Sequence, residues 1–235
     1  MALGHPPSYS GAMNEDAKTR LADIMANIAR VAKLSGRRVE DVGLVAITKT
    51  RVTAAIRPLL EAGQRRFGEN RVQEAQAKWP DLRAEYPDIE LHLVGQLQSN
   101  KAEDAVALFD VIHSVDRAPL IAALAGAQKK TGRCPRCFIQ VNVGNEPQKG
   151  GCSVDALSGL ISDARSAGLD LVGLMAVPPA DMEAAPYFAL LAKLARDHAL
   201  TGLSMGMTGD YETAVMLGAT HVRIGSALFG ARAPL

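Results

Sequence analysis

One unit recurs along this chain, and its recurrence constrains the fold more than any other feature. Each copy is a short run of apolar and β-branched residues, then a polar or glycine-containing loop, then an alanine-rich amphipathic stretch. Such runs are typical of strands, and the amphipathic stretches are typical of helices. The predicted strands span residues 42–48, 65–69, 89–95, 109–115, 137–143, 169–177, 202–206 and 221–225.

The apolar residues of these strands are continuous rather than alternating, which indicates burial on both faces, as in a parallel sheet. Eight strand–helix units in 235 residues predict an α/β fold, a (β/α)8 or TIM barrel, with an extra N-terminal helix over 15–34. An open doubly wound sheet is the alternative, but no G-x-G-x-x-G follows the first strand. We expect residues 1–14 to be a flexible lead-in and 15–235 to form a single domain, because no linker or composition shift divides them.

Charge and hydropathy argue against two classes of protein. The formal net charge is +1 and no dense basic block is present, so nucleic acid is not an expected partner. No apolar run is long enough to cross a bilayer, and the N-terminus lacks the apolar segment of a secretory signal. We therefore expect no membrane partner.

The potential metal ligands do not form a recognisable metal-binding pattern. Cys134 and Cys137 form one C-x-x-C without a second ligand pair, so plain thiols are favoured over a zinc site or a redox pair. Together with Cys152 they cannot all pair internally, which indicates a reducing, cytoplasmic location. His92 and His113 lie within predicted strands and are expected to be core or rim histidines with satisfied hydrogen bonds. No metal site is predicted.

The loops after the seventh and eighth strands combine glycine with hydroxyl residues. They read SMGMTGD (204–210) and RIGSALFG (223–230). Glycine lets backbone N–H groups approach an anion, and the start of the following helix adds a favourable dipole. Barrels commonly bind phosphate at this position. One such loop could be an ordinary turn, but two in adjacent positions predict a phosphate site.

Lys49 stands at the end of the first predicted strand, at the same mouth of the barrel. A lone lysine at a strand end usually extends into solvent. A lysine partly desolvated near another cation, for which Arg223 is the candidate, becomes nucleophilic. A nucleophilic lysine beside a phosphate cradle suggests a phosphorylated aldehyde, of which pyridoxal 5′-phosphate (PLP) held as a Schiff base is the common case.

Arg223 bears on the chemistry that such a cofactor could support. It could simply pair with a neighbouring carboxylate. If it faces the pyridine nitrogen instead, its guanidinium cannot accept a proton and favours an unprotonated ring, which weakens PLP as an electron sink.

Seven ordered segments resemble the pyridoxal phosphate homeostasis protein family, the single-domain relatives of the alanine racemase barrel. The segments are VAITKT, GQRRFGENRVQEA, HLVGQLQSNK, IHSVDR, VNVGNEPQKGG, GLMAV and LSMGMTGDYETAVMLGATHVRIGSALFG. The resemblance implies that Lys49 carries PLP, that Arg223 lies near the pyridine nitrogen and that Asn70 lies near the cofactor. The residues that it implies for the phosphate are Ser204, Met205, Thr208, Gly225 and Ser226.

The resemblance implies a PLP-binding protein that buffers or delivers the cofactor and so affects amino-acid metabolism, with PLP-dependent apo-enzymes as candidate recipients. Related racemases take a second acid–base group, a tyrosine, from an added C-terminal domain. Leu235 follows Gly225 too closely for such a domain, so we expect a monomer and assign no catalytic residue. A monomeric PLP-dependent amino-acid racemase is the alternative function. A class I aldolase or a phosphosugar isomerase on the same barrel is the third hypothesis.

Overall fold

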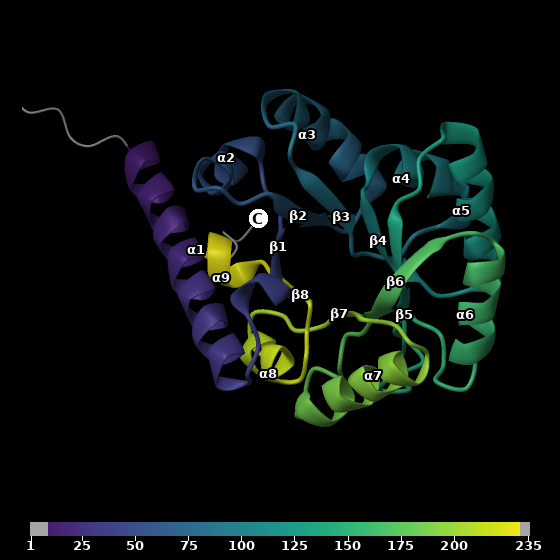
Figure 1. Ribbon diagram of the computed structural model, residues 1–235. Helices are drawn as coiled ribbons and strands as arrows, with labels where there is room; N and C mark the ends of the chain where they lie inside the picture. The colour runs from purple at the N-terminus through teal and green to yellow at the C-terminus, as the bar shows by residue number, and fades with distance from the viewer. Residues whose placement is uncertain (1–8, 231–235) are drawn as a thin grey trace, which may run out of the picture.

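Eight parallel strands close into a barrel in the computed structural model, which describes residues 9–230 (Figure 1). Each strand pairs with the next in chain order, and the eighth pairs with the first, with Val45 opposite Arg223. The strands are Gly43–Ile47 (β1), Arg66–Glu69 (β2), Glu90–Leu93 (β3), Val111–Val115 (β4), Arg136–Gln140 (β5), Asp170–Met175 (β6), Gly202–Ser204 (β7) and His221–Ile224 (β8). The predicted barrel is therefore confirmed, and the alternative of an open sheet is wrong.

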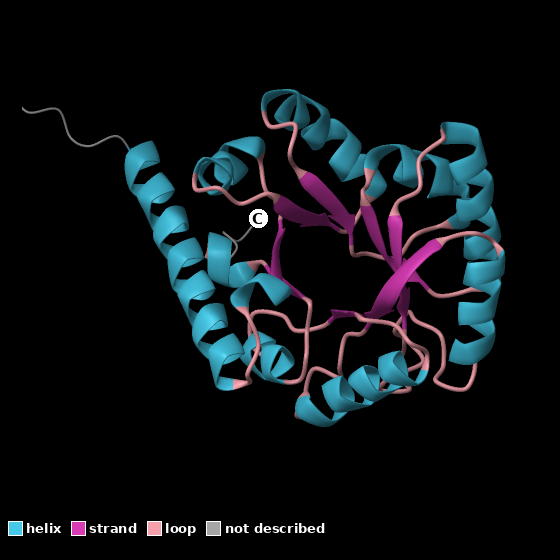
Figure 2. Ribbon diagram, viewed as in Figure 1, coloured by secondary structure: helices cyan, strands magenta, loops and turns pink. Residues whose placement is uncertain are grey.

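Helices surround the strands as an outer layer (Figure 2). They are Tyr9–Leu34 (α1), Thr53–Glu61 (α2), Val72–Glu85 (α3), Ala102–Leu108 (α4), Ala118–Thr131 (α5), Leu157–Ser166 (α6), Ala185–Asp197 (α7), Tyr211–Met216 (α8) and Ser226–Phe229 (α9), with short 3-10 helices at Val39–Asp41 and Ser99–Lys101. Most of the apolar core lies between this layer and the outer face of the strands, where Leu44, Leu91 and Ile224 are buried. Burial of this interface is the main stabilising contribution to such a barrel.

The extra helix α1 lies outside the barrel, alongside α2, α8 and α9 (Figure 1). Its apolar stripe, which includes Ile24, Ile28 and Val31, is buried, as a 3.6-residue period requires. The helix starts at Tyr9, earlier than predicted, so residues 9–14 of the expected lead-in are helical. Residues 1–8 lie outside the described residues.

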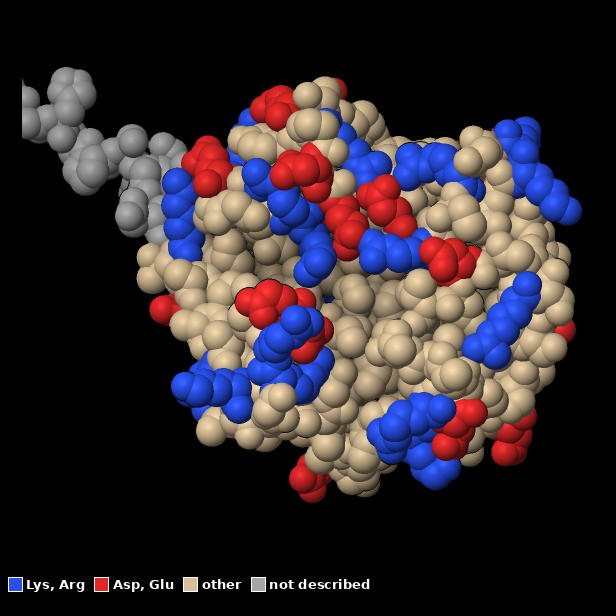
Figure 3. Space-filling view, viewed as in Figure 1, with Lys and Arg blue, Asp and Glu red and all other residues tan. Residues whose placement is uncertain are grey.

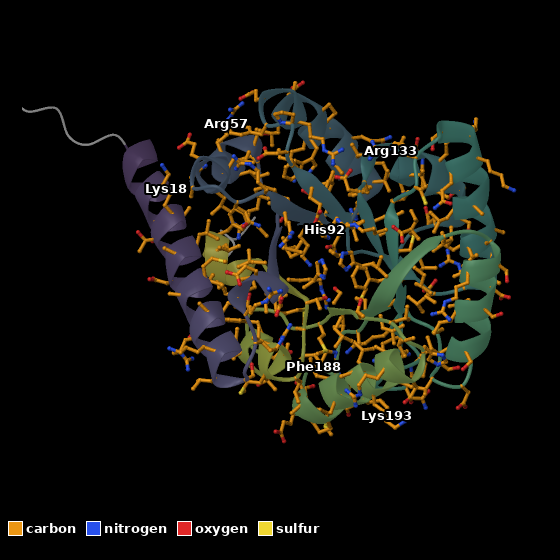
Figure 4. The ribbon with its side chains drawn as sticks, in the orientation of Figure 1. Lys18, Arg57, His92, Arg133, Phe188 and Lys193 are labelled. Atoms are coloured by element: carbon orange, nitrogen blue, oxygen red, sulfur yellow. The ribbon has the colours of Figure 1, made fainter. Side chains whose placement is uncertain are left out.

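The inside of the barrel is partly polar. A small apolar cluster of Val111, Phe138 and Met175 fills one part of it. Two fully buried histidines, His92 and His113, lie on strands β3 and β4. Figure 4 shows His92 in the middle of the ring of strands, whereas Arg57, Arg133 and Lys193 lie at the periphery of the molecule. Buried polar side chains need hydrogen-bond partners. The histidines find theirs in a line of hydrogen bonds that extends to Arg223 at the carboxyl ends of the strands.

No helix among residues 9–230 combines the length and the apolar character needed to cross a membrane.

Candidate cofactor site

A cavity of about 480 Å³ lies at the carboxyl ends of the strands, which is a size typical of small-molecule sites. On the face shown in Figure 3 the surface is hollowed near its middle, with basic and acidic side chains distributed around the rim. The described residues lining the cavity are Ile47, Lys49, Arg51, Asn70, Val94, Val177, Met207, Thr208, Gly209, Arg223, Gly225 and Ser226.

Six of the eight residues that the sequence suggests for the site line this one cavity. They are Lys49, Asn70, Thr208, Arg223, Gly225 and Ser226. Ser204 and Met205 do not line it, because both are fully buried at the end of β7. Among the charged residues and glycines of the lining, sequence reasoning did not single out Arg51 and Gly209. Gly209 lies within the predicted phosphate loop, whereas Arg51 follows a turn in which Thr50 has φ +62°, so strand alternation does not place it.

Lys49 faces the cavity because of strand alternation. Val45 and Ile47 point to the inside of the barrel, where both would touch a side chain placed at Gly68. Lys49 continues this period-two series beyond the strand and is half-buried. Its amine has no hydrogen bond or ion pair with any residue in the range 9–230. The cavity therefore holds an uncommitted amine at its wall.

Thr48 turns the other way and joins a buried polar cluster beneath Lys49. Its hydroxyl donates to Glu69 Oε1 at 2.6 Å. The same oxygen accepts from Lys78 Nζ at 2.7 Å and from Trp79 Nε1 at 3.0 Å. Lys78 also donates to the carbonyl of Thr48 at 2.9 Å, so this cluster holds the chain directly before Lys49 from two sides.

The two predicted phosphate loops meet at one edge of the cavity. The Ser226 hydroxyl donates to Thr208 Oγ1 at 3.2 Å and links the loops directly. Gly206 starts the first loop at φ +91°, where a Cβ would lie 2.5 Å from Ala214 Cβ, so both the backbone and the packing require glycine. Gly209 lines the cavity, and its N–H has no hydrogen-bond partner in the described chain.

Arg223 is the most constrained cation of the site. It is only 5% exposed. Its Nη1 donates to Ser204 Oγ at 2.7 Å and its Nη2 to the carbonyl of Ala176 at 2.9 Å. Burial lowers the pKa of its guanidinium to about 10, so the group stays charged at neutral pH. It makes no ion pair with a carboxylate of residues 9–230, contrary to the simpler expectation for a strand-end arginine.

The charge of the cavity is one-sided. Lys49, Arg51 and Arg223 line it, and its described lining includes no carboxylate. Arg51 is held by a hydrogen bond to the carbonyl of Gly230 at 3.0 Å and lies over the ring of Phe229. Three cations around an apolar and hydroxyl-lined cavity favour an anionic ligand, because unlike charges attract more strongly where water is partly excluded.

The backbone near Asn70 requires glycine at position 95. A Cβ there would lie 2.2 Å from the carbonyl oxygen of Asn70, and backbone atoms cannot yield as a flexible side chain can. We expect Gly95→Ala to lower the free energy of unfolding by about 1–3 kcal/mol and to displace Asn70. Urea denaturation measures the change.

Gly126→Ala is the matched control, because Gly126 is exposed in α5 and a Cβ there meets nothing within 4 Å. This substitution is expected to stabilise the protein by roughly 0.5–1 kcal/mol. Equal effects at both positions would contradict the close approach of Gly95 to Asn70.

The cysteines are free thiols that lie apart from the cavity. Burial raises the pKa of the Cys137 thiol to about 12 and that of Cys152 to about 11, which makes both unreactive at neutral pH. Among residues 9–230, no group of three or more His, Cys, Asp or Glu side chains is arranged to hold a metal ion.

Comparison with known proteins agrees with the fold. Residues 19–233 match the family model of the alanine racemase N-terminal domain, which is the class of barrel described above. The chain is 41% identical over 219 residues to the pyridoxal phosphate homeostasis protein of Pseudomonas aeruginosa, covering 90% of this chain and 94% of that one. It is 34% identical to the protein of the same name from Escherichia coli, covering 92% and 97% of the two chains. The chain belongs to the pyridoxal phosphate homeostasis protein family.

Solved structures show the same barrel. An unknown protein from Bifidobacterium adolescentis superposes with a TM-score of 0.87 at 30% identity, covering 93% of this chain and 96% of that one. PipY of Synechococcus elongatus, with PLP bound, gives a TM-score of 0.74 at 39% identity, covering 87% of this chain and all of PipY. Alanine racemase of Clostridium difficile gives 0.67 at 15% identity, covering 93% of this chain and 57% of the racemase, which shows a shared fold alone.

Proposed function

We propose that this protein binds PLP through a Schiff base to Lys49 and serves in intracellular PLP homeostasis, where it buffers the cofactor or delivers it to PLP-dependent apo-enzymes. The observation that carries the proposal is the uncommitted amine of Lys49 in a cavity lined by cations and hydroxyl-rich loops. The names of the curated relatives and the PLP bound to PipY support the choice of ligand.

The residues present fit the three functional parts of PLP. The phosphate ester is an anion, and Thr208, Gly209, Gly225 and Ser226 offer it hydroxyl and backbone N–H donors. Arg223 offers a fixed cationic donor for the ring nitrogen. Ser204 acts only through Arg223, and Met205 packs behind the loop. When bound, PLP supplies an electrophilic aldehyde and an electron-accepting ring.

The Lys49 amine would hold the aldehyde reversibly. In its unprotonated form this nitrogen would be the group that bonds to the aldehyde carbon, with the aldehyde oxygen lost as water. Addition of water would release the aldehyde again with no net change in oxidation state. A reversible covalent bond of this kind suits storage and delivery, since occupancy follows the concentration of free cofactor.

The surroundings of the cavity favour a carrier over a racemase. A racemase needs a second acid–base group on the opposite face of the cofactor. No tyrosine is among the described residues that line the cavity. Tyr211, which follows the phosphate loop, accepts a hydrogen bond from Asn27 of α1 at 2.8 Å and is held outside it. A charged Arg223 would also disfavour protonation of the ring nitrogen, which weakens PLP as an electron sink for racemisation.

We further infer that residues 15–235 act as one domain, that the protein is a monomer and that it is cytoplasmic. The closed barrel offers no free sheet edge for pairing with a second copy. Its three free thiols suit a reducing compartment.

The experiment that tests the proposal is reduction of the protein with borohydride after incubation with PLP, followed by peptide mass mapping. We expect visible absorption before reduction and a pyridoxyl group on the peptide carrying Lys49. An amino-acid racemisation assay on the same sample separates the two functions, and turnover that is lost in Lys49→Ala would favour the racemase. A colourless protein without an adduct would overturn the PLP proposal and return the third hypothesis, a phosphosugar or aldolase site.

A further inference from the structure

A line of hydrogen-bonded groups crosses the inside of the barrel, from Arg223 at the cavity to the opposite mouth. Arg223 Nη1 donates to Ser204 Oγ at 2.7 Å. Ser204 Oγ lies 2.8 Å from His113 Nδ1, and His113 Nε2 lies 2.8 Å from His92 Nδ1. His92 Nε2 lies 2.8 Å from Glu90 Oε1. Glu90 is the first residue of β3, so the line ends where the strands begin.

The far end of this line is a carboxylate. Glu90 pairs with Arg136 at 2.5 Å and with Arg66 at 3.3 Å. Burial alone would raise its pKa, but the hydrogen bond from His92 and the neighbouring arginines outweigh burial and lower the pKa to about 2. Glu90 is therefore ionised at neutral pH and can only accept hydrogen bonds.

When both imidazoles are neutral, the two ends determine the direction of every hydrogen bond between them. Because Glu90 can only accept, His92 Nε2 carries a proton, and a neutral His92 then accepts at Nδ1. His113 must donate from Nε2 and accept at Nδ1, so the Ser204 hydroxyl donates to it. The Ser204 oxygen is left to accept from Arg223, which can only donate. All four bonds run in one direction, from cation to carboxylate.

The surroundings keep both imidazoles neutral and in place. Burial lowers the pKa of His92, and it lowers that of His113 strongly, with help from the adjacent His92. The charged and titratable groups that face them are Glu90, Arg66, Arg136, Arg223 and His221. Phe138 stacks on His113 with ring centroids 4.6 Å apart, and His221 lies edge-on to Phe138. This packing leaves the His113 ring little freedom to turn.

We propose that Ser204, His113, His92 and Glu90 are positioning residues that hold the Arg223 guanidinium in one orientation toward the ligand. Ser204 occupies one of the guanidinium's donors and Ala176 occupies another, so the remaining N–H groups are directed by a fixed frame. The role toward a ring-containing ligand rests on the proposed function, whereas the direction of the hydrogen bonds along the line does not. Hydrogen bonds in a line polarise and strengthen one another. Such a line would keep the guanidinium in the same orientation when the ligand dissociates.

The first test uses the protein without ligand. Long-range ¹H–¹⁵N NMR at neutral pH reports which nitrogen of each imidazole carries the proton, and His92→Gln and His113→Gln assign the signals. We expect both rings to be neutral with the proton on Nε2. A proton on Nδ1 of either ring, or a charged ring at neutral pH, would overturn the proposed direction.

Variants then locate the link to Arg223. Ser204→Ala removes the hydroxyl that lies between the cation and His113, so the Nδ1 resonance of His113 is expected to shift. Ser204→Thr retains the hydroxyl and should preserve that resonance. Ser114→Ala is the matched control, because Ser114 is equally buried on β4 and its hydroxyl has no hydrogen-bond partner among residues 9–230. An unchanged His113 resonance in Ser204→Ala would contradict the hydrogen bond between Ser204 and His113.

The second test uses two probes that cannot react with Lys49. Pyridoxine 5′-phosphate has the ring and the phosphate but no aldehyde, and inorganic phosphate has no ring. We expect Ser204→Ala to weaken pyridoxine 5′-phosphate about tenfold, the effect of one hydrogen bond to a charged group, and to leave inorganic phosphate unaffected. Ser204→Thr and Ser114→Ala should bind both probes as the unmodified protein does.

The two tests separate the line of hydrogen bonds from the proposed function. If the unmodified protein binds neither probe, the proposed function fails, and the NMR result by itself decides the direction of the hydrogen bonds. If Ser204→Ala binds pyridoxine 5′-phosphate as well as the unmodified protein does, Arg223 is not positioned through Ser204 and the inference is overturned. A loss of thermal stability in Ser204→Ala without any change in ring binding would likewise assign the chain a structural role only.

Discussion

Replacing Lys49 with alanine is expected to abolish the proposed covalent attachment of PLP while the barrel stays folded. The amine is the uncommitted nucleophile of the cavity, and it makes no hydrogen bond or ion pair with the described residues that its removal would break. We therefore expect the free energy of unfolding to change by no more than about 0.5 kcal/mol, as for other half-exposed side chains without partners. Visible absorption with PLP and borohydride mapping measure the first effect, and urea denaturation measures the second.

Lys193→Ala is the matched control, because Lys193 lies on α7 and pairs with Asp197 at the surface. It should retain the absorption and the adduct on Lys49. In Lys49→Ala the two loops remain, so weaker, non-covalent binding of PLP should persist and yield no adduct after reduction. A pyridoxyl group on another lysine of Lys49→Ala, at the same yield as in the unmodified protein, would show that the Schiff base does not depend on this position.

Replacing Glu69 with alanine is expected to cost about 3–5 kcal/mol of unfolding free energy, the largest loss of stability that we predict. Glu69 is fully buried and receives hydrogen bonds from Thr48, Lys78 and Trp79. The side chain of Lys78 is only 10% exposed, so removing the carboxylate leaves a nearly buried ammonium group without its counter-charge. Urea or thermal denaturation measures the change.

Glu69→Gln separates charge from volume. The amide preserves the shape and one acceptor oxygen but not the negative charge, so we expect a loss between zero and that of alanine. Glu85→Ala serves as the surface control, because Glu85 also receives hydrogen bonds from a cation, Arg57, but is exposed to solvent. Its effect should be small, since water screens such pairs. A similar loss in Glu85→Ala and Glu69→Ala would mean that burial does not govern the contribution of Glu69.

Replacing Glu69 should also disturb the position of Lys49. Glu69 accepts hydrogen bonds from Thr48 and Lys78, and Lys78 also donates to the carbonyl of Thr48. These contacts fix the backbone directly before Lys49. At a temperature where Glu69→Gln is still folded, we expect PLP to bind it more weakly than the unmodified protein, because the amine is less firmly placed.

Much of the fold could be predicted because it depends on local patterns. The apolar run at 42–48 predicted β1, which spans Gly43–Ile47, and the run at 221–225 predicted β8, which spans His221–Ile224. Strand ends were less accurate: the run at 137–143 became Arg136–Gln140, because the ladder to β6 and not hydropathy decides where a strand stops. Helix α1 begins upstream of the prediction, at Tyr9, because apolar periodicity alone does not mark the end of an amphipathic helix.

The sequence by itself determined the barrel, the lysine at the end of the first strand and the two glycine- and hydroxyl-rich loops, because each follows from residues close together in the chain. Only the tertiary structure decided that Ser204 faces Arg223 and His113 inside the barrel instead of the cavity, and that Glu69 holds Thr48, Lys78 and Trp79. These partners lie on different strands and helices, and the closure of the barrel brings them together. The periodicity of one strand shows which face a side chain occupies, but the group that it meets there depends on the register of all eight strands.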